Sequence, residues 1–171
     1  MAFINLAGED AENTAAGAAA TELDAVRSLM PYIEDKWETP ASIANLTLSA
    51  RLAGSTTEVL ALLQQANAVQ LNQEYNEPPH WFMPLRHCVG TVQLQMGDAP
   101  AADQTFRDDL TRNFPDNGWS LYGLVTAMRA QVDRYTDRDI ALVQGAFDAA
   151  WERADYALDE ATLACPMFAG L

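Results

Sequence analysis

The sequence predicts an all-α protein in which short helices pack in pairs and the pairs stack on one another. Apolar residues recur at steps of three and four positions through most of the chain, which is the period of an amphipathic helix. Alternating apolar and polar runs, which would indicate strands, are scarce. Glycine and proline interrupt the apolar pattern at short intervals, so the helices are expected to be joined by short turns.

Three helices are expected in the N-terminal half of the chain, over residues 11–30, 41–52 and 58–75. Pro31 ends the alanine-rich first helix, because proline disrupts a helix that it interrupts. Residues 34–40 are interpreted as a connector. Gly54 ends the second helix, and Ser55 is in the right place to cap the third.

Four further helices are expected in the C-terminal half, over residues 84–96, 101–113, 119–132 and 137–161. Gly97 separates the first two, and the turn-forming residues 114–118 separate the second from the third. The last helix is expected to be long, because its apolar stripe extends to Leu158. We therefore expect one domain over 1–171, with a leading helix followed by helix pairs at about 41–75, 84–113 and 119–161.

Small residues and one aromatic recur at spacings that suggest a repeat. Gly90 and Gly123 are 33 positions apart, and each lies in the first helix of a predicted pair. Ala102 and Phe106 follow Gly90 after 12 and 16 positions, in the second helix of that pair. Small side chains let neighbouring helices approach closely, and Phe106 is expected to fill the space between pairs. The corresponding aromatic of the next pair is Phe147.

These spacings resemble the tetratricopeptide repeat, a helix pair of about 34 residues. The segment 77–123 further resembles the C-terminal part of a family of bacterial tetratricopeptide proteins. The matching residues are Glu77, Pro78, Pro79, Trp81, Phe82, Pro84, Arg86, Asn117, Gly118, Trp119, Ser120, Leu121, Tyr122 and Gly123. The resemblance implies a right-handed α-solenoid with a scaffold role, and no established chemistry. Family members usually carry more repeats before this part, which leaves open whether the chain is a piece of a longer protein.

The charge balance excludes some partners. The formal charge is −14, with 24 acidic and 10 basic residues, so the surface is expected to repel nucleic acid. The acidity is interpreted as serving solubility, with adaptation to high salt as an alternative. No stretch is long and apolar enough for a membrane helix, and residues 1–14 do not have the pattern of a secretory signal. We expect a cytoplasmic protein.

The stretch 77–90 carries the candidate chemistry, with His80, His87 and Cys88 in fourteen positions. Zinc ligation is disfavoured, because adjacent helix residues point to different sides and no paired ligand spacing is present. A Cys–His nucleophile is disfavoured because the side chains of adjacent helix residues cannot hydrogen-bond usefully to each other. In addition, no third group is present that would orient the histidine. Both cysteines, Cys88 and Cys165, are expected to be buried free thiols. We expect no metal, no cofactor and no catalysis.

The remaining residues of this stretch are interpreted as structural. Pro78 and Pro79 stiffen a connector, and Arg86 is expected to pair with Glu77 or to cap nearby carbonyls. Elsewhere, the acidic pair Asp108 and Asp109 is expected to be solvated.

The predicted function is noncatalytic binding of an unknown peptide or protein in the concave groove of the helix pairs. By the repeat register, the residues expected to line this groove are Arg51, His87, Thr91, Leu94, Gln95, Ser120, Leu124, Ala127 and Gln131. Most of them are neutral, which disfavours a ligand with an acidic C-terminal tail. The alternative is a structural segment that self-associates as a homodimer through an exposed end helix.

Overall fold

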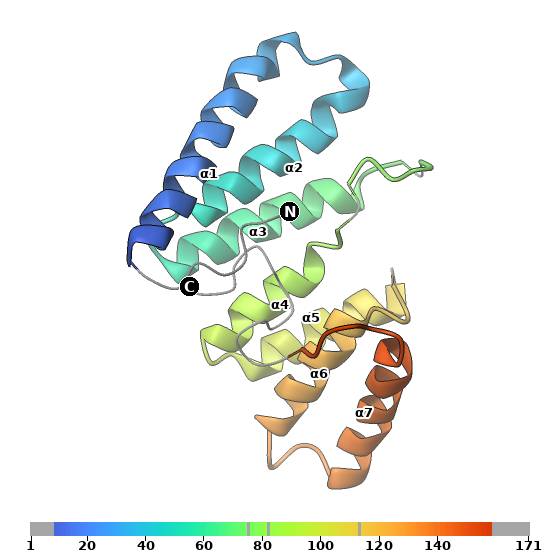
Figure 1. The fold of residues 1–171 in the computed structure, drawn as a ribbon. Helices are drawn as coiled ribbons and strands as arrows, with labels where there is room; N and C mark the ends of the chain where they lie inside the picture. Colours follow the sequence, from blue (N-terminus) through green and yellow to red (C-terminus); the bar gives the residue numbers. More distant parts are fainter. Residues whose placement is uncertain (1–8, 75, 82, 113, 159–171) are drawn as a thin grey trace. The chain divides into compact units, whose positions relative to one another are not determined.

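In the computed structural model, all regular secondary structure in the described part of the chain is helical (Figure 1). The structure describes residues 9–74, 76–81, 83–112 and 114–158. Its elements are α1 (Glu9–Leu29), the 3₁₀ helix η1 (Met30–Tyr32), α2 (Asp35–Arg51), α3 (Thr56–Leu71), α4 (Arg86–Gln95), α5 (Ala99–Arg112), α6 (Gly118–Arg129) and α7 (Asp137–Trp151). No helix in these ranges is long and apolar enough to cross a membrane. The all-α prediction is confirmed.

The chain divides into two compact units, residues 1–85 and 86–171. In unit 1, α1 packs on α2 and α2 packs on α3 (Figure 1). Leu23 of α1, Ile43 of α2 and Leu63 of α3 are buried in this unit. The side chain of Ser55 caps α3 by accepting a hydrogen bond from the Glu58 amide at 3.3 Å, as the sequence predicted.

Helix α2 begins earlier than the sequence predicted. Residues 35–40 were expected in a connector, but they form the start of α2, and Pro40 lies inside the helix. Proline removes one backbone donor and crowds the carbonyl four residues before it. In α2 that carbonyl belongs to Lys36 in the first turn, so the missing backbone hydrogen bond affects only the start of the helix. The Trp37 amide instead donates to the Glu34 carbonyl at 2.8 Å, which tightens this turn.

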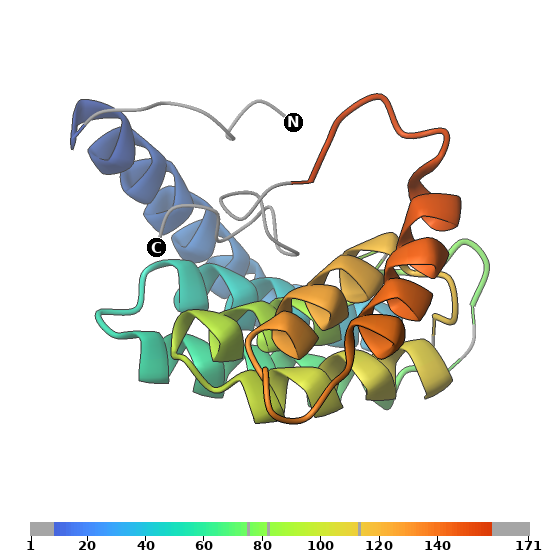
Figure 2. The ribbon, with the colours of Figure 1, turned by 90° about the horizontal axis from the view of Figure 1, so that it is seen from below.

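In unit 2, each of α4, α5 and α6 packs on the next helix, and α4 also packs on α6 (Figure 2). A Schellman motif ends α4, because Gly97 has φ +79° and its amide donates to the Leu94 carbonyl at 2.9 Å. The amide of Asp98 donates to the Gln93 carbonyl at 2.9 Å, which completes the motif. The Asp98 side chain then caps α5 by accepting from the Ala101 amide at 3.1 Å. The predicted break at Gly97 is therefore present.

The Phe106 ring lies between α4 and α6. It is fully buried, in a core cluster with Ala102, Leu124, Ala127 and Met128. A Cβ atom added at Gly90 would lie 2.7 Å from the ring, and one added at Gly123 would lie 2.3 Å from it. The ring therefore fills the space between α4 and α6, while the arrangement of the helices as repeat pairs stays a prediction. The right-handed superhelix remains a prediction.

Helix α7 is shorter than predicted. It ends at Trp151, whereas the sequence suggested that it continues to residue 161. The Ala154 amide donates to the Trp151 carbonyl at 2.9 Å, and the Trp151 indole donates to the Tyr156 carbonyl at 2.8 Å. These bonds turn the chain away from the helix axis, so Leu158 lies outside α7. Residues 159–161 are outside the described part.

The close contact at Gly123 can be tested with alanine. We expect Gly123→Ala to lower the free energy of unfolding by about 1–3 kcal/mol, since the new methyl group would overlap the Phe106 ring. The measurement is urea denaturation of the full chain. Gly145→Ala is the matched control, because nothing lies within 4 Å of a Cβ at that helical position. Alanine there should stabilise by about 0.5–1 kcal/mol.

A second substitution tests whether overlap with the Phe106 ring causes the loss of stability. Phe106→Leu in the Gly123→Ala background should recover part of the loss, because leucine leaves room for the methyl group. Equal stability of wild type and Gly123→Ala would contradict the proposed role of this contact.

Candidate binding site

An aromatic cluster crosses unit 2 from α4 to α7. The His87 ring on α4 stacks on Trp119 of α6, with 6.1 Å between ring centroids, and Trp119 meets the edge of Trp151 at 5.0 Å. Spacings of three and four residues put Tyr122 on the same face of α6 as Trp119, and Phe147 on the same face of α7 as Trp151, while Tyr156 follows α7. The aromatic cluster consists of His87, Trp119, Tyr122, Phe147, Trp151 and Tyr156. It joins the first helix of one predicted pair to both helices of the next.

His87 is the most unusual member of this cluster. Its side chain is 2% exposed, and neither ring nitrogen has a hydrogen-bond partner among the described residues. Burial lowers the pKa of His87 from 6.5 to about 3, so the imidazole is neutral at physiological pH. The Trp119 indole nitrogen is also buried without a partner in the described chain. A buried polar group without a partner costs about 1–3 kcal/mol, so these two side chains lower the stability of the free protein.

The structure places most of the predicted groove residues in the interior. The buried ones are His87, Thr91, Ser120, Leu124 and Ala127. Arg51, Leu94 and Gln131 are half-buried, and only Gln95 is exposed. Arg51 belongs to unit 1 and the other eight to unit 2. The surface that a partner can reach at the predicted groove of unit 2 is therefore centred on Leu94 and Gln95, at the end of α4.

Asp109 corrects the prediction of a solvated acidic pair. It is 1% exposed and accepts hydrogen bonds from the Ser120 hydroxyl at 2.6 Å and the Asn117 amide at 2.9 Å. Burial raises the pKa of this carboxyl, while the two hydrogen bonds and the positive charge of Arg86 act in the opposite direction. Arg86 thus acts on an acidic residue of its own unit, and its predicted pairing with Glu77 stays a prediction. Asp109 joins α5 to the start of α6.

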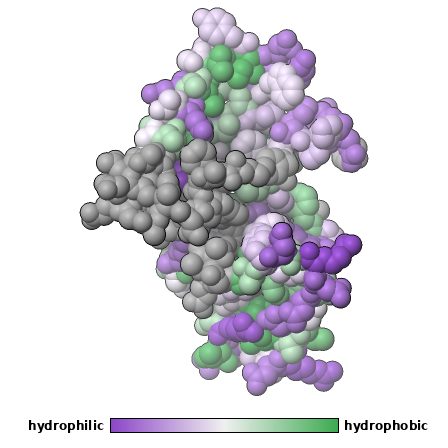
Figure 3. Space-filling model, viewed as in Figure 1, coloured by the Kyte–Doolittle hydropathy of each residue, from purple (hydrophilic) through white to green (hydrophobic). Residues whose placement is uncertain are grey.

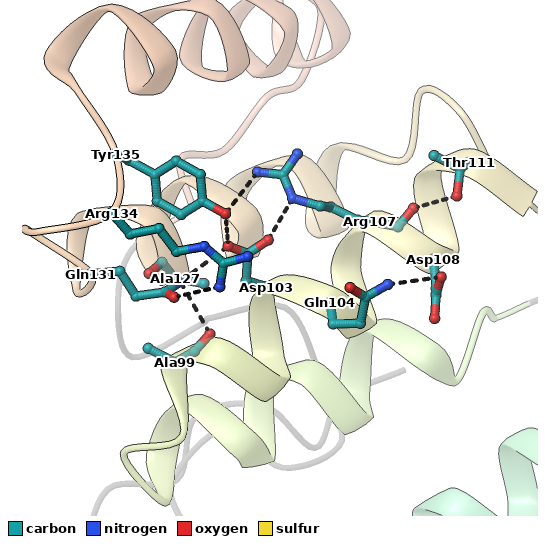
Figure 4. A network of polar contacts seen from close by, with 10 residues as sticks. All are labelled: Ala99, Asp103, Gln104, Arg107, Asp108, Thr111, Ala127, Gln131, Arg134 and Tyr135. Atoms are coloured by element: carbon teal, nitrogen blue, oxygen red, sulfur yellow. Dashed lines mark hydrogen bonds and ion pairs between the residues drawn. The ribbon is translucent and has the colours of Figure 1, made fainter.

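A second buried carboxylate, Asp103, was not singled out from the sequence (Figure 4). It is 1% exposed and accepts from Arg107 Nε at 2.5 Å, from Gln131 Nε2 at 3.1 Å and from the Tyr135 hydroxyl. The spacing of Asp103 and Arg107 was a signal for their ion pair, because residues four apart are neighbours on a helix. The contact with Tyr135 had no such signal, since 32 positions separate the two residues.

Two arginines complete this polar network around Tyr135. The guanidinium groups of Arg107 and Arg134 lie 5.5 and 5.3 Å from the Tyr135 ring centroid. The Arg134 side chain also donates to Gln131 Oε1 at 3.1 Å (Figure 4). Gln131, which was predicted to face the groove, therefore uses its amide to hold the turn between α6 and α7 on α5. The network is a structural anchor, because the oxygens of Asp103 are occupied by donors of the protein.

The stretch 77–90 is divided between the two units. His80 is exposed in unit 1, where its Nε2 lies 2.8 Å from the Asn76 amide nitrogen and its ring lies 5.0 Å from the Trp37 ring centroid. His87 and Cys88 belong to unit 2. In the described ranges, no three histidine, cysteine or acidic side chains are grouped as metal ligands would be.

Cys88 corrects the expectation of a free thiol. It is disulfide-bonded, and the other cysteine of the chain, Cys165, lies outside the described residues. Disulfides persist mainly in oxidising compartments, so Cys88 gives no support to the expected cytoplasmic location.

Burial of neutral His87 predicts a pH-dependent stability. Between pH 6.5 and 3 the unfolded chain binds a proton at His87 and the folded chain does not, so the free energy of unfolding falls as the pH falls. At pH 5 this contribution is about 2 kcal/mol. We expect His87→Phe to remove this contribution to the free energy of unfolding, because phenylalanine cannot take up a proton. Urea denaturation at several pH values between 7 and 4 measures the effect.

The control is His80→Gln, which removes the exposed histidine of unit 1 and should keep the pH dependence of wild type. The raised pKa of Asp109 contributes with the opposite sign, but it is present in wild type and in both variants and therefore largely cancels in the comparison. Identical pH profiles for wild type and His87→Phe would show that His87 is not buried in its neutral form.

Comparison with known proteins found no family model, no curated protein and no solved structure that matches this chain. The resemblance of segment 77–123 to bacterial tetratricopeptide proteins thus stays an expectation from its motifs. Function must be inferred from the packing and the chemistry of the chain itself.

Proposed function

We propose that the chain is a noncatalytic binding module of the tetratricopeptide type, which holds a peptide or a partner protein on stacked helix pairs. The observation that carries the proposal is the seating of the Phe106 ring against Gly90 and Gly123. It joins α5, the second helix of one pair, to the first helices of two successive pairs. Direct packing of α4 on α6 supports the same assignment.

Stacking has a consequence for binding. A single helix pair cannot bury both of its faces, so successive pairs cover one another and leave a face of their first helices for a partner. In unit 2 those first helices are α4 and α6. The accessible residues of the predicted groove there are Gln95, which is exposed, and Leu94, which is half-buried beside the core cluster. A partner is expected to contact this end of α4 through an apolar group and a hydrogen-bonding group.

The buried titratable groups of unit 2 support a noncatalytic role. Asp103 and Asp109 are each occupied by donors from other helices or turns, and the His87 ring is closed off from solvent. General acid–base catalysis needs a group within hydrogen-bond reach of a substrate. None of these three side chains offers that in the folded protein, so each is assigned to stability.

The proposal predicts that a bound partner lies close to Gln95. With the photoreactive residue p-benzoylphenylalanine at Gln95, the full chain should form a discrete covalent adduct with one protein in an extract of its source cells. The same residue at Leu142, which is 69% exposed on α7, is the control and should not capture that protein. Gln95→Arg in the purified chain should then weaken binding of the captured partner about tenfold, through steric and charge mismatch. Equal capture at both positions would count against the groove.

Self-association is a second candidate, because α7 has an accessible apolar face. The described structure buries no residue of α7 completely, Leu142 is 69% exposed, and nothing lies within 4 Å of a Cβ at Gly145. Another helix, from a second copy of the chain, would cover this face.

Light scattering across a concentration series tests this candidate. If α7 forms a homodimer, Leu142→Glu should shift the mass to that of a monomer, because two glutamates would be buried at the interface. Asp148→Asn, at an exposed position of the same helix, is the control and should leave the dimer intact. A monomer in wild type at every concentration would reject self-association.

A further inference from the structure

The turn between α1 and α2 in unit 1 exposes a concentration of large apolar side chains. Leu29 is 58% exposed, Tyr32 83% and Trp37 48%. Nine large hydrophobic residues are exposed in the described chain, and three of them lie within these nine positions. Scattered exposed apolar residues need no explanation, but a local group of them marks a candidate interaction surface.

Trp37 is held in place by its neighbours. The His80 ring lies 5.0 Å from it, and His80 is in turn hydrogen-bonded to Asn76 at 2.8 Å. The proline-rich connector is therefore packed beside the first turn of α2. A fixed aromatic ring is a better docking surface than a mobile one, because less side-chain entropy is lost on binding.

The same ring already lies beside a cation. Lys36 Nζ is 5.9 Å from the Trp37 ring centroid and 2.9 Å from Glu34 Oε2. This lysine is the only one in the chain, and its side chain is 62% exposed. One positive group therefore reaches both the Trp37 ring and the Glu34 carboxylate from solvent.

The charge of unit 1 favours a basic partner. Residues 1–85 contain 11 acidic and 3 basic side chains, which makes this unit strongly negative. Glu34, Asp35 and Glu38 are exposed around the turn. In Figure 3, hydrophilic and hydrophobic residues lie side by side on the surface of unit 1. Acidic groups beside aromatic rings are the chemistry that binds arginine, whose planar guanidinium stacks on rings and pairs with carboxylates.

We propose that this surface is a docking site for a basic, arginine-bearing segment of another protein. We call it the α1–α2 tip, and its residues are Leu29, Tyr32, Glu34, Asp35, Trp37 and Glu38. An arginine of the partner stacks on Trp37 or Tyr32 and pairs with the carboxylates, and an apolar neighbour packs on Leu29. The site belongs to unit 1 and is independent of the binding proposed for unit 2, so each proposal can fail without the other.

The first test uses a peptide as the probe. The blocked peptide Gly-Arg-Leu-Arg-Gly is titrated into the full ¹⁵N-labelled chain, and the indole signals of the four tryptophans are followed by NMR. We expect the Trp37 signal to move and the Trp119 signal to stay. The peptide Gly-Glu-Leu-Glu-Gly should move neither. Movement of all indole signals together, or no binding, would overturn the proposal.

The second test uses variants, with binding measured by calorimetry. Tyr32→Ser and Trp37→Leu should each raise the Kd of the arginine peptide about fivefold, the loss expected for one cation–π contact. Phe114→Ser changes an aromatic of unit 2 that is 43% exposed, and should have no effect. All three substitutions leave the net charge of the chain unchanged, so a diffuse attraction to the acidic surface would give every variant the same Kd. That outcome, or a dimer that Tyr32→Ser dissociates, would show that the tip does not recognise a basic segment.

Discussion

The packing of unit 2 depends on one aromatic ring that rests against two helix backbones. Phe106 reaches from α5 to Gly90 on α4 and Gly123 on α6, where any larger residue would overlap it. Because the glycines have no side chains, the two helices can approach the ring closely and also pack on each other. This contact therefore sets how closely α4, α5 and α6 approach one another, and α7 packs on α6.

The two buried carboxylates of α5 hold α6 by hydrogen bonds near both of its ends. Asp103 and Asp109 lie three residues before and after Phe106, on the same side of α5. Asp109 holds the start of α6 through Ser120, Phe106 contacts its middle at Gly123, and Asp103 binds Gln131 just beyond its end. An apolar contact alone allows a helix to slide, whereas hydrogen bonds at both ends fix its register. Buried polar groups in this arrangement contribute to specificity of packing more than to its strength.

The two units present different chemistry to possible partners. Unit 1 carries exposed aromatic side chains among carboxylates at the α1–α2 tip, which suits a positively charged segment. Unit 2 carries the neutral residues Leu94 and Gln95 at the predicted groove, which suits an apolar or hydrogen-bonding segment. Two segments of unlike charge would not compete for one surface.

The sequence by itself determined the helical class and most helix ends. These follow from local causes, since the apolar period, the cap at Ser55 and the positive φ at Gly97 each involve residues within two turns. Tertiary structure alone decided that Asp109 is buried, that Gln131 holds a turn and that α7 stops at Trp151. A carboxylate is buried only when distant helices bring it donors, and the donors of Asp109 and Asp103 come from other elements of the fold. Partners brought together across helices leave no trace in local spacing.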